Sequence, residues 1–366
     1  MIMNQRRITI LGGGNTAFST AAKLTIDGFD ITLCELPRFK NQIETIKDTK
    51  EIYLESVTGS DVANLYNVTT DFSIALSFSN LVLVIVPSYA HSEFINAALP
   101  FIDNNHIIVL MPGNLGSIQW KKMALEAGKS CIISEVDTAP YVCRKTSSDS
   151  VIIWGVVSQL GIGVLPSIET NQVFDLLQNI FPGLSTYSDV MECGLSAANP
   201  VVHPVGVLMN AGRIEYSHGE FYFYEEGVSK SVAEVIMAVD KERINIGKYL
   251  GYSLHPINEV FHNAGFGPKG NLWETINGSY MLTRLKAPGN LSSRWLTEDI
   301  PFGLVTWSFL ANHFNIETPM INSIINLGSV IMETNPWESG RDITSFGIAN
   351  KSVDDIKSFL KNGSLN

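Results

Sequence analysis

The fold of this chain is decided by ITILGGGNTA at residues 8–17. The pattern indicates a buried strand, a glycine turn and the start of a helix, and a second strand-like run follows at residues 31–35. Gly12, Gly14 and Ala17 occupy the three key places of a GxGxxA pattern. The first glycine permits the tight turn, the second lets the backbone approach a pyrophosphate, and the alanine keeps the helix close to the sheet. The stretch therefore predicts a dinucleotide-binding domain.

Two charged residues after the second strand bear on the choice of dinucleotide. Glu35 lies about 20 residues after the glycine turn, where a carboxylate accepts from the adenosine ribose hydroxyls of NAD and repels the extra phosphate of NADP. Arg38 offsets that repulsion if it pairs with a 2′-phosphate. We therefore expect NAD or NADP as cofactor, with a slight preference for NAD. The expected cofactor-binding residues are Gly12, Gly14, Asn15, Ala17, Glu35, Arg38 and Pro87.

The composition is that of a globular protein with more than one domain. The chain has 366 residues, of which 45% are hydrophobic and 17% charged, and its formal net charge is −11. This acidic balance argues against a nucleic-acid partner, and no segment approaches the roughly 20 apolar residues that span a membrane. The apolar run after Arg7 ends at Gly12, so we expect no signal peptide and a cytoplasmic location. The four cysteines lack CxxC spacing, which indicates neither a metal site nor a disulfide framework.

Four further apolar runs in the first half have the length of strands, at residues 81–86, 107–111, 131–135 and 151–157. The first two are continuous and each is followed by a proline, as expected of strands buried on both faces of a parallel sheet. The loops after the carboxyl ends of such strands line the edge where an open α/β sheet binds its ligand. Pro87, at one of these strand ends, therefore joins the expected cofactor site.

Long helical periods replace this pattern from about residue 190 onwards. Apolar residues recur on one face between residues 232 and 250, and again after Thr318-Pro319, which has the form of an N-cap followed by proline at the first helical position. We therefore expect an α/β Rossmann-type domain with a doubly wound parallel sheet at residues 1–190, and an all-α domain at residues 191–366.

One of the seven histidines has a setting that suggests chemistry. His203 lies in Asn199-Pro200-Val201-Val202-His203-Pro204, where the helical part begins. Asn199 is expected to cap a helix with Pro200 at its first position, and Pro204 removes the N–H that would bond back to Pro200. The first turn is therefore expected to be irregular, which suits a side chain that faces a cleft. A structural histidine fits the same context equally well.

A second group of candidates is Arg294-Trp295-Leu296-Thr297-Glu298-Asp299. An arginine binds a carboxylate through a planar pair of N–H groups that lysine lacks. An aspartate can orient an imidazole and favour its charged form, as a general acid–base needs. On spacing alone, a charged helix start at the surface is the plainer interpretation.

Taken in order along nearly the whole chain, these elements resemble the octopine/nopaline (opine) dehydrogenase family. The matching segments are Gly12 to Ala17, Glu35 to Phe39, Val86 to His91, Tyr141 to Arg144, His203-Pro204 with Leu208 to Asn210, and Arg294 to Val305. In that family a histidine and an aspartate form the catalytic pair, and an arginine assists with a substrate carboxylate. The resemblance assigns these roles to His203, Asp299 and Arg294.

The resemblance implies an NAD(P)H-dependent enzyme acting on small molecules. Such an enzyme joins the amine of an amino acid to a 2-oxo acid such as pyruvate and reduces the imine to a secondary amine dicarboxylate. The resemblance also implies a homodimer, and Thr138, at another strand end, is a further candidate for substrate binding. Two alternatives stay open: a simple 2-oxo acid or 2-hydroxy acid dehydrogenase of the same fold, and a nucleotide-sensing protein without turnover.

Overall fold

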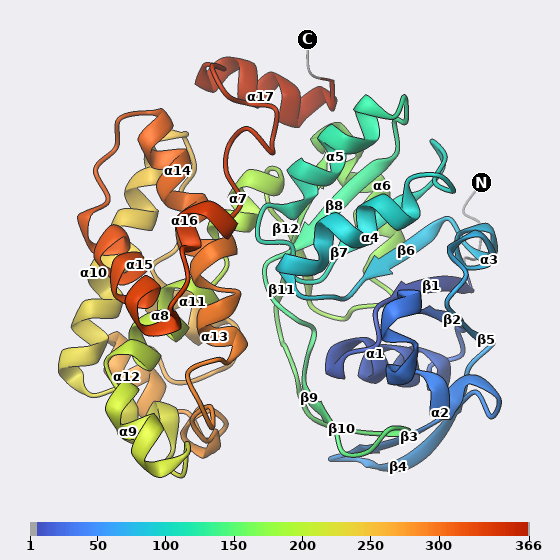
Figure 1. The fold of residues 1–366 in the computed structure, drawn as a ribbon, viewed down its shortest axis with the longest axis horizontal. Coiled ribbons are helices and arrows are strands. Elements are labelled where there is room, and N and C mark those ends of the chain that lie inside the picture. The colour runs from blue at the N-terminus through green and yellow to red at the C-terminus, as the bar shows by residue number, and fades with distance from the viewer. Residues whose placement is uncertain (1–5, 365–366) are drawn as a thin grey trace. The chain divides into compact units, whose positions relative to one another are not determined.

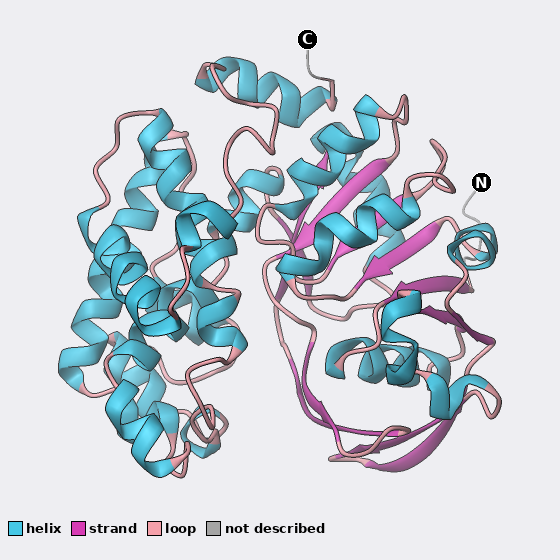
Figure 2. Cartoon of the chain, viewed as in Figure 1, coloured by secondary structure: helices cyan, strands magenta, loops and turns pink. Residues whose placement is uncertain are grey.

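The computed structural model describes residues 6–364 of the chain. The chain forms two units (Figure 1): the first comprises Met1–Gly194 with Lys357–Asn366, and the second comprises Leu195–Ile356. Among the described residues, every strand belongs to the first unit, and the second unit is built of helices and loops (Figure 2).

The main sheet of the first unit confirms the predicted Rossmann-type sheet. Its strand order is β12-β11-β8-β7-β6-β1-β2-β5, and every neighbouring pair from β8 to β5 is parallel. The order reverses between β1 and β6, which is the switch point where doubly wound sheets bind their ligands. The strands are β1 (Arg7–Leu11), β2 (Asp30–Cys34), β5 (Asn67–Thr69), β6 (Leu81–Val84), β7 (Ile107–Leu110), β8 (Ile132–Val136), β11 (Leu160–Leu165) and β12 (Leu184–Thr186).

One end of this sheet is not parallel. β11 runs antiparallel to β8, and β12 runs parallel to β11. A parallel neighbour needs a long crossover, usually a helix, whereas an antiparallel neighbour does not. After β8 the chain leaves the sheet to form β9 (Tyr141–Lys145) and β10 (Ser150–Val156). It then re-enters the sheet as β11, next to the end of β8, where the Asp137 N–H donates to the Gly161 oxygen at 3.1 Å.

A second, four-stranded sheet has the order β4-β3-β10-β9. β3 (Glu51–Ser56) and β4 (Gly59–Asn64) form a hairpin, β10 pairs parallel with β3, and β9 pairs antiparallel with β10. The helix α1 (Asn15–Ile26) contacts β1 and β2 of the main sheet as well as the four strands of the second sheet, so it lies between the two (Figure 1). Residues 151–157, predicted as a strand, therefore belong to a sheet that the sequence pattern does not separate from the first.

Helices cover both faces of the main sheet. On one face, Phe18 of α1 and Val173 of α6 share a core with Ile10 of β1. On the other face, Phe94 of α4 and Trp120 of α5 are part of a separate core. The helices of this unit that precede the second unit in the sequence are α1, α2 (Glu44–Lys47), α3 (Phe72–Phe78), α4 (His91–Ala98), α5 (Gly116–Glu126), α6 (Thr170–Leu177) and α7 (Val190–Leu195).

The end of the chain departs from the domain division expected from the sequence. The sequence analysis gives all residues after 190 to the helical domain, whereas the structure groups Lys357–Asn366 with the first unit. The physical reason lies in α17 (Val353–Asn362), whose Phe359 and Leu360 are buried. Directly after this helix, a Cβ built on Gly363 would lie 3.1 Å from atoms of both Lys121 and Pro166.

The second unit consists of helices joined by loops and two π-helical segments. Its long helix α10 corresponds to the apolar period predicted between 232 and 250, and α15 to the one predicted after Thr318-Pro319. The helices are α8 (Asn199–Leu208), α9 (Ala211–Ser217), α10 (Lys230–Tyr249), α11 (Ile257–Asn263), α12 (Leu272–Asn277), α13 (Arg294–Thr297), α14 (Val305–His313), α15 (Pro319–Met332) and α16 (Pro336–Ser339), and the π-helical segments are Phe223–Gly227 and Ile300–Leu304.

Buried charges on α10 hold neighbouring segments in place. The Arg243 guanidinium donates to Asp240 and to the backbone oxygens of Leu195 and His255. Glu242 accepts from the first backbone N–H groups of α15, so it caps that helix where the side chain of Thr318 makes no capping hydrogen bond. Each of these charges is paired with an opposite charge or accepts hydrogen bonds, which offsets the desolvation cost of burial.

Candidate functional site

The glycine turn lies at the switch point between β1 and β6. Gly12 follows β1, and its φ of +122° is open to glycine alone. A Cβ built on Gly12 would lie 2.5 Å from the Ile85 oxygen and 2.8 Å from Val86 Cγ1, both after β6. Gly12 is therefore required by the fold of the turn itself.

Gly14 has a different environment. It is the N-cap of α1, and a Cβ built on it would meet no atom within 4 Å. No side chain caps the first turn of α1, so this helix start presents backbone N–H groups and the positive end of its dipole to the open space beside Gly14. The fold does not need glycine here, whereas a pyrophosphate seated on the helix start does. The turn thus fits a bound dinucleotide.

Glu35 lies directly after β2 and is turned toward this glycine turn. Its Oε1 atom accepts from the Leu36 N–H at 2.7 Å, and a Cβ built on Gly13 would lie 2.8 Å from its Oε2. Burial raises the pKa of the Glu35 carboxyl to about 6, and the N–H groups of Leu36 and Gly13 oppose that shift. The Glu35 carboxylate has further lone pairs, so it can accept hydrogen bonds from the ribose hydroxyls of a dinucleotide.

The other residues expected to bind the cofactor have varied surroundings. Ala17 is fully buried in α1, and Asn15, the first residue of that helix, accepts from the Lys145 backbone N–H at 2.9 Å. Pro87 begins the segment after β6 as the N-cap of a short 3-10 helix, Ser88–Ala90. Arg38 forms an ion pair with Glu93 of α4. The expected role of Arg38 at a 2′-phosphate therefore competes with a partner within the protein.

In the second unit, His203 and Asp299 meet in a buried pair. His203 Nδ1 lies 2.9 Å from Asp299 Oδ2, although the two residues are 96 positions apart in the sequence. Their side chains are 12% and 7% exposed. Burial raises the pKa of the Asp299 carboxyl, and the contact with His203 opposes that rise. Because Nδ1 faces the carboxylate, it carries a hydrogen and donates, which leaves Nε2 to exchange a proton with another group.

Aromatic side chains pack against one face of the His203 imidazole. The indole of Trp295 is stacked on the imidazole, with 4.3 Å between ring centroids and 7° between planes. Trp295 is in turn held edge-on by Phe223 at 4.6 Å, and Phe223 packs against Gly206 so closely that a Cβ there would lie 2.4 Å from its Cζ. These rings and the Asp299 contact leave the imidazole one orientation.

Both π-helical segments of this unit adjoin the pair. One of them, Ile300–Leu304, begins directly after Asp299, and the other, Phe223–Gly227, supplies Phe223 and Tyr224. Burial raises the pKa of the Tyr224 hydroxyl, and the nearby Asp299 carboxylate raises it further. Single π turns interrupt regular helices mostly at functional sites.

Arg294 lies on α13, which carries Trp295. Its Nε donates to Glu298 Oε2 at 2.7 Å, and its side chain is 55% exposed, whereas that of Glu298 is 5% exposed. Glu298 therefore holds the plane of the guanidinium along one edge. The positive charge of Arg294 opposes the rise in the pKa of Asp299 that burial causes. The four residues from the arginine–acid segment that the structure places together are Arg294, Trp295, Glu298 and Asp299.

The start of α8 differs from the predicted cap. The N-cap is Ala198, and Asn199 is the first helical residue, with Pro200 second. Pro204 lies inside the helix and, as predicted, brings no N–H to bond with Pro200. Backbone N–H groups of Val201 and Val202 both donate to the Ala198 oxygen, so the first turn begins one residue earlier than the sequence pattern indicates.

The family match falls mostly within the second unit. Residues 186–332 match the family described as NAD/NADP octopine/nopaline dehydrogenase, alpha-helical domain. Opine dehydrogenase from Arthrobacter sp. (strain 1C) is 25% identical over 362 residues, which cover 98% of this chain and 100% of that protein. The helical part of the chain thus matches the octopine/nopaline dehydrogenase model, and nearly the whole chain is similar to opine dehydrogenase.

Solved structures of two opine-type dehydrogenases share the fold of this chain. Octopine dehydrogenase in complex with NADH and agmatine has a TM-score of 0.78 at 18% identity, and the match covers 96% of this chain and 98% of that one. Yersinopine dehydrogenase with bound NADP+ has a TM-score of 0.71 at 13% identity and covers 97% of each chain.

Thr138, the expected substrate residue outside the helical unit, is half-buried two residues after β8. Its neighbour Asp137 accepts from the Tyr187 hydroxyl at 2.8 Å and from the Gly161 N–H at 3.2 Å. Burial raises the pKa of Asp137 to about 7. Like the glycine turn, these residues lie at a carboxyl strand end, where open α/β sheets bind their ligands.

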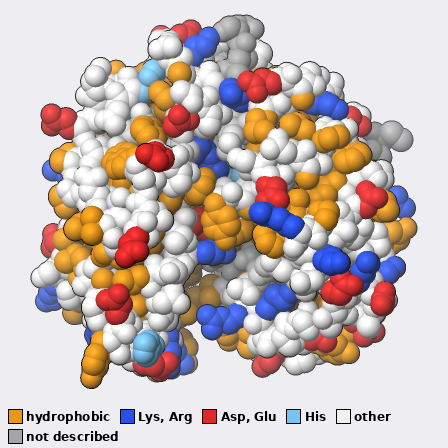
Figure 3. All heavy atoms as spheres, viewed as in Figure 1, with side chains coloured by type: hydrophobic (Ala, Val, Ile, Leu, Met, Phe, Trp, Pro, Cys, Tyr) orange, Lys and Arg blue, Asp and Glu red, His pale blue; other side chains and the backbone are white. Residues whose placement is uncertain are grey.

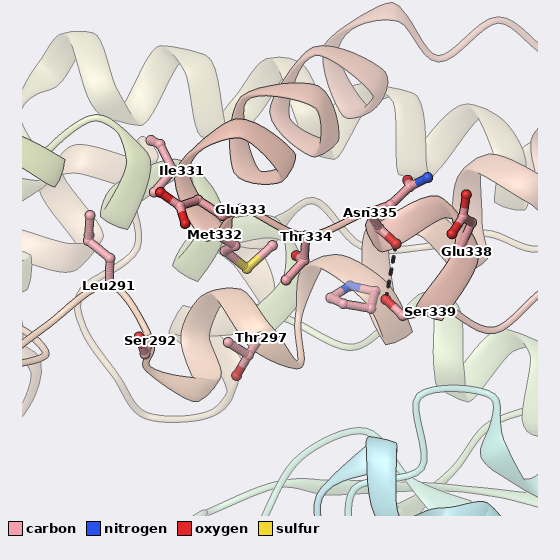
Figure 4. A pocket seen from close by; sticks show the side chains of 11 residues that line it. Leu291, Ser292, Thr297, Ile331, Met332, Glu333, Thr334, Asn335, Glu338 and Ser339 are labelled. Carbon is pink, nitrogen blue, oxygen red and sulfur yellow. Dashed lines mark hydrogen bonds between the residues drawn. The ribbon is translucent and has the colours of Figure 1, made fainter.

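The helical unit also has an open pocket, of about 710 Å³ (Figure 4). Its lining includes the carboxylates of Glu333 and Glu338 and the hydroxyl of Thr297, with the apolar side chains of Ile331 and Met332. Neither His203 nor Asp299 lines it. The pocket is therefore separate from the His203–Asp299 pair.

Three further properties of the described residues concern metal binding, membrane-spanning helices and charged patches. Within residues 6–364, no group of three or more His, Cys, Asp or Glu side chains is arranged to hold a metal ion. None of the helices described there has the length and apolar character needed to cross a membrane. On the face drawn in Figure 3, Lys and Arg side chains are interspersed with Asp and Glu, in a chain of formal net charge −11.

Sequence reasoning missed the aromatic support of His203. Trp295 lies between two residues that were singled out, and the run at 221–224 indicates packing only. Trp295 stacks against a side chain 92 positions earlier, and no local sequence pattern predicts such a contact. The one available signal is that this tryptophan directly follows Arg294, the expected carboxylate-binding residue.

Proposed function

We propose that this protein is an opine dehydrogenase that uses NADH or NADPH. It joins the amine of an amino acid to the carbonyl carbon of a 2-oxo acid such as pyruvate, and it reduces the resulting imine to a secondary amine with two carboxylates. The observation that carries the proposal is the buried contact between His203 Nδ1 and Asp299 Oδ2 in the domain that matches this family.

The first unit would hold the dinucleotide through the turn after β1. The N–H groups at the start of α1 bind the pyrophosphate beside Gly14, and Glu35 accepts from the ribose hydroxyls. Pro87 and the segment after β6 border the same switch point. The reduced nicotinamide of the bound dinucleotide supplies the hydride, and the protein supplies orientation and charge.

His203 acts as the acid and base of the condensation. The amine attacks the carbonyl carbon, and the carbonyl oxygen takes a proton from Nε2 of the imidazolium. The added nitrogen then returns a proton to Nε2, and Nε2 passes this proton to the hydroxyl, which leaves as water. The product is the protonated imine, which accepts the hydride. Asp299 keeps the hydrogen on Nδ1 and stabilises the imidazolium between these transfers, as a positioned acid–base pair requires.

Arg294 and Thr138 are the proposed substrate-binding residues. The guanidinium of Arg294 offers a planar arrangement of N–H groups to a substrate carboxylate, and Glu298 fixes the plane. Thr138 offers a hydroxyl at a carboxyl strand end of the sheet. Residues 1–190 would thus serve the nucleotide, and the helical domain from residue 191 would serve the catalytic pair.

A matrix of amino acids against 2-oxo acids tests this function. Loss of nicotinamide absorbance should require one compound of each kind together, and mass spectrometry should find their N-linked condensate reduced by two hydrogens. Each compound alone serves as the control. Full activity with the 2-oxo acid alone, with a hydroxy acid as product, would instead identify a simple dehydrogenase. Tight NADH binding without oxidation across the whole matrix would identify a nucleotide sensor.

Two further properties belong to the same proposal. We place the enzyme in the cytoplasm, which the four free thiols support because disulfides are rare there. We also propose a homodimer, on the family resemblance alone. Light scattering coupled to size-exclusion chromatography measures the mass of the assembly, and the mass of one chain, 40.2 kDa, would contradict the dimer.

A further inference from the structure

We propose that Lys145, presented by the second sheet beside Glu35, binds the 2′-phosphate of NADP and so lets this protein bind NADPH as well as NADH. This inference rests on the proposed dinucleotide site. It assigns the choice between the two cofactors to a residue far from the glycine turn in sequence, and it takes that role away from Arg38.

Lys145 is tied to the nucleotide turn by its backbone and by its side chain. It is the last residue of β9, and its N–H donates to the side-chain oxygen of Asn15, which directly follows Gly14. Its Nζ donates to the Gln42 oxygen at 3.1 Å and lies 3.3 Å from the centroid of the Phe18 ring. These contacts hold the ammonium between α1 and the segment that follows β2.

Glu35 faces the same small space. A Cβ built on Gly13 would lie 2.8 Å from Glu35 Oε2 and 3.2 Å from Gln42 Oε1, so the turn, the carboxylate and Gln42 pack together. Burial raises the pKa of Glu35 and lowers that of Lys145, and the charge of each residue opposes the shift of the other. The ammonium therefore lies within electrostatic reach of the carboxylate that receives the ribose hydroxyls.

A carboxylate alone at this position repels a 2′-phosphate. An ammonium has three donors, of which one bonds to Gln42, so Lys145 has donors left for phosphate oxygens. It can offset the charge of Glu35 without displacing it, so the site would accept both cofactors.

Arg38 is less well placed for this role. Its guanidinium is paired with Glu93 of α4 and lies over the ring of its neighbour Phe39, 4.4 Å from the centroid. A 2′-phosphate would compete with the Glu93 carboxylate for the guanidinium of Arg38, and most of the Arg38 side chain, 61%, is exposed to screening by solvent and salt.

The test compares dissociation constants for NADH and NADPH, measured by fluorescence or calorimetry on the free protein without substrate. Lys145→Met should weaken NADPH binding roughly 10- to 100-fold, the range expected for one charge-assisted hydrogen bond, and leave the NADH constant close to wild type. Lys145→Arg should keep NADPH binding. Arg144→Met removes an exposed charge from the adjacent position of the same strand and is the matched control.

The pH dependence of the ratio gives a second readout. Burial lowers the pKa of Lys145 to about 8, while Glu35 at the end of β2 and Asp149 in the turn before β10 oppose that shift. Gln42 and Phe18, from the other elements packed against it, do not titrate. NADPH affinity should therefore fall relative to NADH affinity as the pH rises through about 8, and Lys145→Arg should remove this fall because arginine stays charged.

The outcomes separate this inference from the proposed function. Absence of NADH binding by the wild-type protein would refute the dinucleotide site itself. NADH binding with no measurable NADPH binding, or an equal selectivity in wild type and Lys145→Met, would refute the role of Lys145 alone. Loss of NADPH binding in Arg38→Met but not in Lys145→Met would assign the phosphate to Arg38.

Discussion

At the scale of single residues, His203 is held by two groups, Asp299 at its Nδ1 atom and Trp295 against its ring face. His203→Ala should lower turnover by roughly 100- to 10,000-fold, because a positioned acid–base group contributes about that much. The NADH dissociation constant should stay close to wild type, since His203 lies in the helical unit. Steady-state kinetics and direct binding measure the two effects separately.

A second histidine–carboxylate pair provides the control for that prediction. His255 Nδ1 lies 3.2 Å from Glu259, but both side chains are exposed, at 65% and 49%. His255→Ala should leave turnover unchanged. Asp299→Asn should also slow turnover, and the loss in the double variant should be far smaller than the product of the single losses, because the pair acts as a unit. Near-normal turnover of folded His203→Ala would overturn the assignment.

Glu35 makes the stability of the free protein depend on pH. Its pKa is raised by burial from an ordinary 4.5 to about 6, so the folded protein binds this proton more tightly than the unfolded chain does. The free energy of unfolding should therefore fall as the pH rises from 4.5 to about 6, by about 2 kcal/mol from this group. Urea titrations across that range should show the fall diminished in Glu35→Gln. A variant with an unchanged pH profile would mean that Glu35 is solvated in the free protein.

The roles of individual residues differ in how far the sequence predicts them. Gly12 and Gly14 follow from the motif, because each position has a fixed geometric requirement. The pairing of His203 with Asp299 came from the family resemblance, since the 96 residues between them leave no local pattern. Lys145 has no signal in the sequence at all. Its position depends on how a strand of the second sheet packs against α1.

At the scale of elements, the site depends on the close approach of α8 to the π-helical segment Phe223–Gly227. Gly206 of α8 permits that approach, because a Cβ would lie 2.4 Å from Phe223 Cζ. Gly206→Ala should push Phe223 against Trp295 and disturb the ring stacked on His203. We expect a loss of up to about 2 kcal/mol in unfolding free energy, because overpacking outweighs the gain in helix propensity.

Turnover of Gly206→Ala should fall roughly tenfold, since a small misplacement of a catalytic group is costly. Gly212→Ala on α9 is the matched control, because its Cβ would meet no atom within 4 Å, and it should gain about 0.4–1 kcal/mol with normal turnover. Denaturant titration and steady-state kinetics measure both. A destabilised Gly206→Ala that keeps full turnover would show that Trp295 does not position His203.

Elements were predicted well where burial alone determines them. β6 and β7 are continuous apolar strands of the central sheet, and α10 and α15 carry the expected apolar faces. The sequence does not predict β3 and β4, because exposed strands have only a weak hydrophobic pattern. In β4 (Gly59–Asn64) a single residue is buried. The assignment of β10 to the second sheet follows from pairing with β3, about a hundred residues earlier, which no local pattern encodes.

At the scale of the whole molecule, binding of the dinucleotide should raise the unfolding free energy of the first unit and change that of the second unit less. NADH at 100 times its dissociation constant should add about 2.7 kcal/mol to the unfolding free energy of the unit that binds it. Hydrogen exchange measured by mass spectrometry should show the added protection within Met1–Gly194, and Leu195–Ile356 should respond less.

Gly14→Val distinguishes this binding effect from a general loss of fold. The open space beside Gly14 accommodates the new side chain in the free protein, at a cost of about 1 kcal/mol for a poorer N-cap. The same side chain fills the space of the pyrophosphate, so the stabilisation by NADH and by NADPH should both disappear. Gly12→Val, by contrast, should unfold the turn, because its Cβ would collide with the Ile85 oxygen at 2.5 Å. Retained NADH stabilisation in a folded Gly14→Val protein would place the pyrophosphate elsewhere and refute the assignment of this turn.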